Sequence, residues 1–151
     1  MNEYVELMLN GKKISLITDA GTPCISDPGF LLVREAIKSG VKITCLPGPT
    51  ALIPAIVLSG LSSDTFIFEG FLPRKKGRQT KLKEISDNTI TTIIYESPYR
   101  IIKTLSDLLE FLGADRKISV SREISKMYED TFRGTVSAVS YTHLRAHETV
   151  R

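Results

Sequence analysis

Short apolar runs alternate along the chain with segments of helical periodicity, and loops rich in glycine and proline separate them. Residues 14–18 predict a buried strand, and residues 29–39 predict the helix that follows it. The same order recurs with a strand over residues 41–46 and a helix over residues 51–59. A spacing of about thirty residues suits a right-handed βαβ crossover, so we expect these two strands to run parallel.

The pattern restarts after the polar break Ser62-Ser63-Asp64, which predicts a domain boundary between residues 62 and 63. Alternating strands and helices favour an α/β class in both halves. The second half, residues 63–136, predicts strands over 65–72, 90–95 and 117–121 and helices over 79–86 and 99–111. The pattern then stops, so residues 137–151 are expected to be an atypical tail, non-native or disordered, whose removal from residue 138 changes nothing functional.

Two glycine–proline loops follow the first two predicted strands, and parallel strands bring such loops to one edge of a sheet, where ligands bind. One turn of this kind is typical of an ordinary surface loop, but its recurrence favours a ligand site. Gly21 and Gly48 allow a ligand to approach the backbone, and the neighbouring prolines hold each loop in shape. The candidate residues are Asp19, Ala20, Gly21, Thr22 and Pro23 in the first loop and Pro47, Gly48, Pro49 and Thr50 in the second.

The sequence excludes the common phosphate-binding loops, because it contains neither Gly-x-Gly-x-x-Gly nor Gly-Lys-Ser/Thr. Asp19 and Asp27 would repel a polyphosphate but would tolerate a cationic or neutral ligand. Preorganised main-chain groups in these loops suit a nucleotide-like ligand.

Composition describes a globular chain of 151 residues with 42% hydrophobic residues and a net charge of +3. No apolar run approaches the roughly twenty residues that span a bilayer, and no signal peptide is evident, so a cytoplasmic location without membrane contact is expected. Cys24 and Cys45 are expected to be reduced thiols. His143 and His147 lack a third ligand, so no metal site is expected.

Basic residues concentrate between Arg74 and Lys83, where six of ten side chains are cationic. Such a run can neutralise phosphates of a nucleic acid, or it can form an ordinary solvated helix face. The six residues are Arg74, Lys75, Lys76, Arg78, Lys81 and Lys83.

Two carboxylates, Glu96 and Glu123, follow predicted strands in the second half. A carboxylate in this position can serve as a general base or accept a hydrogen bond from a ligand hydroxyl. The alternative is an ion pair with Arg100 or Arg122. Ser97 is interpreted as the cap of the next helix.

These motifs, in this order, resemble the small-subunit ribosomal RNA methyltransferases of the tetrapyrrole-methylase superfamily. The resemblance rests on Asp19-Ala20-Gly21-Thr22-Pro23 with Ile25-Ser26-Asp27-Pro28-Gly29, Pro47-Gly48-Pro49-Thr50-Ala51, Phe68-Glu69-Gly70-Phe71-Leu72-Pro73-Arg74-Lys75, Tyr95-Glu96-Ser97-Pro98, and Arg122-Glu123 with Lys126 and Glu129. It implies a class III S-adenosylmethionine methyltransferase fold, with two α/β domains of which the first, residues 1–62, is incomplete. The family's first strand with its Gly-Asn-Leu loop, and the Ala-Glu-Asp-Thr-Arg segment that follows, have no counterpart here.

The resemblance implies methylation of the ribose 2′-hydroxyl of a cytidine in small-subunit (16S) ribosomal RNA, with S-adenosylmethionine as cofactor. The two loops would then shape the cofactor pocket, Glu96 or Glu123 would assist the reaction, and Arg74, Lys75, Lys76, Arg78 and Arg100 would hold RNA. The 30S subunit and a second copy of the chain would be partners. Tyr99 stands where the family commonly has His, which weakens a catalytic role there. A non-catalytic basic RNA-binding fragment and a tetrapyrrole (precorrin-type) methyltransferase remain the alternatives.

Overall fold

The computed structural model describes residues 2–148, including the side chains of residues 3–142. The chain forms two compact units, Met1–Thr50 and Ala51–Arg151. The division falls before α3 (Leu52–Ser59) rather than after it, where the sequence predicted a boundary. α3 belongs to the second unit because Arg133 Nε donates to Leu58 O at 2.6 Å and Leu52 N donates to Tyr95 Oη at 3.1 Å.

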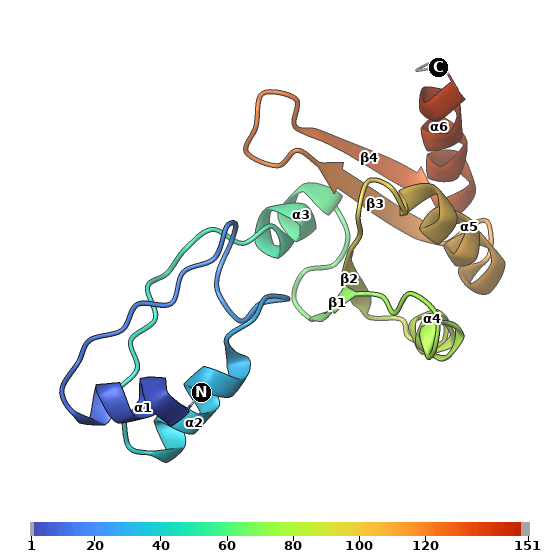
Figure 1. Ribbon diagram of the computed structural model, residues 1–151. Coiled ribbons are helices and arrows are strands. Elements are labelled where there is room, and N and C mark those ends of the chain that lie inside the picture. Colours follow the sequence, from blue (N-terminus) through green and yellow to red (C-terminus); the bar gives the residue numbers. More distant parts are fainter. Residues whose placement is uncertain (1, 149–151) are drawn as a thin grey trace. The chain divides into compact units, whose positions relative to one another are not determined.

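The first unit contains two helices, α1 (Asn2–Leu9) and α2 (Phe30–Lys38), which contact each other (Figure 1). The helix predicted over residues 29–39 is confirmed as α2, which buries Ala36. It ends where Ser39 N donates to Glu35 O and Gly40 adopts a left-handed φ of 78°. α1 was not predicted.

The two strands predicted in the first half are not formed among the described residues. Residues 14–18 and 41–46 have no ladder partner in either sheet, and Ile17 and Leu46 are 85% and 81% exposed. The apolar pattern is that of a strand, but a strand exists only where another strand receives its backbone hydrogen bonds. The prediction of a parallel pair here was therefore wrong for this chain.

The second unit contains the two sheets and follows the predicted alternation closely (Figure 1). β1 (Phe66–Phe71) pairs in parallel with β2 (Thr91–Tyr95), with a register shift between Phe68 and Gly70. β3 (Lys117–Arg122) pairs in antiparallel with β4 (Asp130–Thr135), which was not predicted. α4 (Arg78–Asp87) and α5 (Ile101–Leu112) form where the periodicity placed helices.

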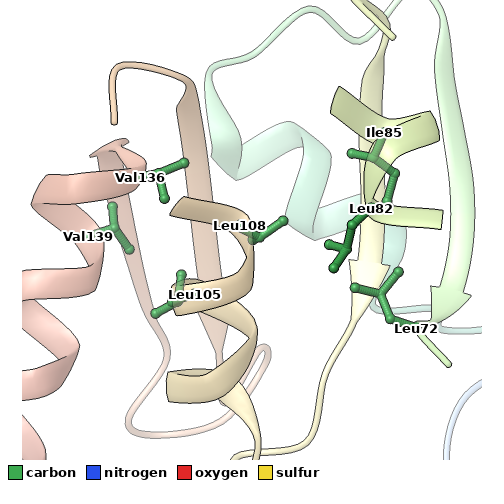
Figure 2. Close-up of a cluster of buried hydrophobic side chains, with 7 residues drawn as sticks. All are labelled: Leu72, Leu82, Ile85, Leu105, Leu108, Val136 and Val139. Atoms are coloured by element: carbon green, nitrogen blue, oxygen red, sulfur yellow. The ribbon is translucent and has the colours of Figure 1, made fainter. Parts of the chain in front are cut away.

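The core of the second unit forms where α5 packs against α4 and α6 (Val136–Glu148). Figure 2 shows Leu105 and Leu108 of α5 lying between the apolar side chains of the neighbouring elements. Burial of this cluster drives the packing of the three helices. Its other members are Leu72, Leu82, Ile85, Val136 and Val139.

A cavity of about 760 Å³ separates the two sheets. Residues 89–96 line it along β2, and residues 115–121 line it along β3, while side chains from α3 and α5 complete its walls. The edges of β2 and β3 that face the cavity are not paired with each other.

The tail differs from the disordered segment that was expected, because residues 136–148 form α6. Val136 and Val139 are 0% and 3% exposed and belong to the core. The sequence did not predict this helix, because the residues after Ser140 are mostly polar and the apolar pattern is short. The helix packs against α5 and the β3–β4 hairpin.

We therefore expect that ending the chain after Ser137 lowers the free energy of unfolding by about 1.5–3 kcal/mol, because Val139 is lost from the core. Urea unfolding followed by far-ultraviolet circular dichroism measures this. A chain that ends after Thr142, and keeps Val139 and Ser140, is the control. Equal stability of both truncated chains and the full chain would show that α6 does not contribute to the core.

Candidate functional site

The structure brings the two glycine–proline loops together in the first unit. Thr22 Oγ1 donates to Pro49 O at 3.2 Å, although the two residues lie 27 positions apart. A Cβ added at Gly48 would lie 3.8 Å from Thr22 Oγ1, and one at Gly21 would lie 3.8 Å from Pro49 O. Gly21 and Thr22 of the first loop therefore lie beside Gly48 and Pro49 of the second.

The first loop is held in a compact conformation by contacts of its own. Thr18 Oγ1 donates to Asp27 Oδ2 at 3.1 Å, and Cys24 and Ser26 adopt left-handed φ angles of 70° and 58°. At Gly29, where φ is 130°, an added Cβ would lie 2.6 Å from Leu16 Cδ2. Such closely packed, unusual backbone is typical of loops that are preorganised for a ligand.

In the second unit, Glu96 is almost fully enclosed at the end of β2, with 4% of its side chain exposed. Its Oε1 accepts from Ser97 N at 2.7 Å and forms an ion pair with Arg100 Nη2 at 2.7 Å. Its Oε2 accepts from Thr104 Oγ1 at 2.6 Å. The ion pair with Arg100, which the sequence offered as an alternative to a catalytic role for Glu96, is formed.

Arg78 extends the same network into the interior, and it is only 8% exposed. Its Nε donates to Asp107 Oδ2 at 2.7 Å, its Nη1 to Pro73 O at 3.1 Å, and its Nη2 to Thr104 Oγ1 at 2.8 Å. The sequence grouped Arg78 with the RNA-contacting cations. In the structure all three of its nitrogens bind groups inside the fold, which favours a structural role for Arg78.

Exposed cations lie in the loop before α4, where Arg74, Lys75 and Lys76 line a groove of about 460 Å³. Lys103 of α5 lines the same groove and was not singled out from the sequence. Lys81 lies outside it and forms ion pairs with Glu84 at 2.6 Å and Glu69 at 3.2 Å, which raise the pKa of its ammonium group. We call the residues that line this space the basic groove.

Glu123, directly after β3, has a different environment from Glu96. Its side chain is 49% exposed, and its carboxylate contacts Lys126 Nζ at 3.2 Å rather than Arg122. Arg122 instead pairs with Asp130 at 3.5 Å. Glu123 itself has a left-handed φ of 52° in the loop that leads to β4. Of the two candidate carboxylates, Glu123 is the more exposed, whereas Glu96 lies at the wall of the cavity between the two sheets.

Within the described residues, no cluster of three or more His, Cys, Asp or Glu side chains has the arrangement of a metal site. Cys24 and Cys45 are free thiols. The side chains of His143 and His147 lie outside the described part of the structure. No described helix has the length and apolar character of a membrane span.

Comparisons with known proteins place the chain in a family. The family model described as Tetrapyrrole (Corrin/Porphyrin) Methylases matches residues 2–140. The chain is 43% identical to "Ribosomal RNA small subunit methyltransferase I" of Thermotoga maritima over 142 residues, which cover 93% of the chain and 64% of that relative.

Two further relatives carry the same name. The protein of Vibrio cholerae is 51% identical over 126 residues, covering 83% of the chain and 44% of the relative. That of a Synechocystis species is 45% identical over 141 residues, covering 92% of the chain and 50% of the relative. The chain thus spans 44–64% of the length of these three relatives. On the match of residues 2–140, the chain belongs to the tetrapyrrole (corrin/porphyrin) methylase family.

Proposed function

We propose that the chain binds S-adenosylmethionine through its two glycine–proline loops and serves the methylation of small-subunit ribosomal RNA. The observation that supports the proposal is the hydrogen bond from Thr22 to Pro49, because it joins two loops that are distant in sequence. The relatives named ribosomal RNA small subunit methyltransferase I support the choice of RNA.

The loops suit this cofactor in charge and in shape. Their main-chain donors and acceptors can hold an adenine and a ribose, and Gly21 and Gly48 leave room for close approach. Asp19 adds negative charge, which favours a sulfonium cation. When bound, S-adenosylmethionine supplies an electrophilic methyl group.

We assign the acceptor as the ribose 2′-hydroxyl of a cytidine in 16S ribosomal RNA. Methylation joins the hydroxyl oxygen to the methyl carbon, breaks the sulfur–methyl bond, and releases the hydroxyl proton. Glu123 is positioned by the β3–β4 loop as an exposed carboxylate that can accept this proton. Glu96 instead positions Arg100 and Thr104 through the contacts of its two oxygens.

The basic groove would hold RNA phosphates, with Arg74, Lys75 and Lys76 as its contacts. Arg100, whose side chain is 29% exposed and is paired with Glu96, would also contact RNA. The printed name of the relatives favours RNA over a tetrapyrrole as the substrate. The 30S subunit as the complete substrate, a homodimer and a cytoplasmic location stay predictions from the family resemblance.

The function is tested by incubating the chain with methyl-labelled S-adenosylmethionine and unmethylated 30S subunits. The proposal expects label in 16S ribosomal RNA, on a cytidine whose ribose resists alkaline cleavage at its 3′ side. Label on a base, or label in a tetrapyrrole and none in RNA, would contradict the assigned acceptor.

Thr22→Val is expected to weaken S-adenosylmethionine binding by about two- to tenfold, because one hydrogen bond between the two loops is lost. Isothermal titration calorimetry of the wild-type and variant chains measures the change. Thr44→Val, at an exposed position in the same unit, is the control and should bind like the wild type. If the Thr22 and Thr44 variants bind S-adenosylmethionine with equal affinity, the Thr22–Pro49 contact does not contribute to cofactor binding.

A further inference from the structure

Lys103 lies on the first turn of α5, far in sequence from the cluster of basic residues before α4. Its side chain is exposed, and it lines the basic groove together with Arg74, Lys75 and Lys76. Nothing in the spacing of the sequence connects Lys103 to these residues. The connection arises only because α4 packs against α5.

Arg78 fixes the position of Lys103 relative to the other cations. It reaches from the first residue of α4 to Thr104 and Asp107 on α5, at 2.8 Å and 2.7 Å. Lys103 precedes Thr104 and lies four residues before Asp107, so it shares the Asp107 face of the helix. Leu82 and Leu108 belong to one core cluster, which reinforces this packing (Figure 2).

The charges that line the basic groove favour an anionic ligand. Asp107 is neutralised by the ion pair with Arg78, whose side chain is 10% exposed. Among the residues that line the groove, Glu110 is then the remaining acidic side chain, against four exposed cations in number. Four neighbouring cations around a groove suit the closely spaced phosphates of an RNA backbone.

We infer that Lys103 contacts an RNA phosphate in the basic groove, so that RNA is held by α5 as well as by the loop before α4. This inference rests on the proposed RNA substrate. It goes beyond that proposal because it selects contacts by their place in the groove. RNA contacts could be set by the basic run in the sequence or by the lining of the groove. Lys83 distinguishes these alternatives, since it belongs to the basic run but not to the lining of the groove.

The test compares Lys103→Gln with Lys83→Gln, which is also an exposed lysine on a helix of the same unit. The full chain is titrated against a fluorescein-labelled fragment of 16S ribosomal RNA at several salt concentrations, and fluorescence anisotropy gives the dissociation constant. Thermal melting confirms that both variants fold like the wild type. Arg74→Gln serves as the positive control for the groove.

For Lys103→Gln we expect a loss of about two- to fivefold in affinity at low salt. We also expect the slope of log K against log salt to fall in magnitude by about 0.7–0.9, as for the loss of one phosphate contact. Lys83→Gln should leave both quantities unchanged. If Arg74→Gln lowers the slope while Lys103→Gln matches Lys83→Gln, the inference is wrong and the proposed function stands. If the wild type itself does not bind the RNA, both are wrong.

Discussion

Glu123→Gln is expected to lower the rate of methyl transfer to 16S ribosomal RNA by about 10²–10⁴, the usual contribution of a positioned general base. Glutamine keeps the size of the side chain but cannot accept the proton that the ribose hydroxyl releases. The exposed carboxylate of Glu123 is held by Lys126 in a loop, so the substitution removes no core contact. Single-turnover methyl transfer from labelled S-adenosylmethionine measures the rate.

Glu96→Gln provides the contrast, because Glu96 is enclosed and its two oxygens bind Ser97, Arg100 and Thr104. It should lower the melting temperature as well as the rate, whereas Glu123→Gln should lower the rate alone. Glu84→Gln, at an exposed position on α4, controls for the loss of one negative charge. If Glu123→Gln transfers the methyl group at the wild-type rate, Glu123 is not the general base.

Arg78→Met is expected to lower the free energy of unfolding of the second unit by about 3–5 kcal/mol, because it leaves a partly buried carboxylate without its partner. Asp107 would lose the guanidinium at 2.7 Å, and Thr104 Oγ1 and Pro73 O would each lose a donor. Methionine fills much of the same volume, so the loss reports the polar contacts rather than a cavity.

Urea unfolding of the full chain measures the effect, and Arg74→Met is the matched control, since Arg74 is exposed a few residues earlier. The control should change the free energy of unfolding by less than about 0.5 kcal/mol. If Arg78→Met is as stable as Arg74→Met, then Arg78 is not the link between α4 and α5 that the structure describes. Arg78 could then bind RNA, as the sequence predicted.

The periodicity of the sequence predicts most of the second unit, because its strands and helices are long enough to show their pattern. β1, β2, β3, α4 and α5 all lie within a few residues of their predicted positions. β4 escaped prediction because Asp130-Thr-Phe-Arg-Gly-Thr is mostly polar, and only its pairing with β3 makes it a strand. Conversely, residues 14–18 have a strand pattern but no partner.

The candidate site shows the same division between local and long-range information. The glycine–proline loops are evident from composition, and their contact through Thr22 and Pro49 agrees with the prediction that they lie together. The burial of Arg78 could not be predicted, since its partners on α5 lie 26 and 29 residues away. The position of Lys103 in the basic groove depends on the same helix packing.

Calorimetric titration of S-adenosylmethionine into the wild-type chain shows whether the loops of residues 19–23 and 47–50 form a cofactor site. We expect a saturable heat of binding with one molecule bound per chain. We also expect Gly48→Val to abolish this heat, because a branched side chain would occupy the space beside Thr22. A wild-type chain that is folded but gives no heat of binding at millimolar cofactor would contradict the proposed cofactor site.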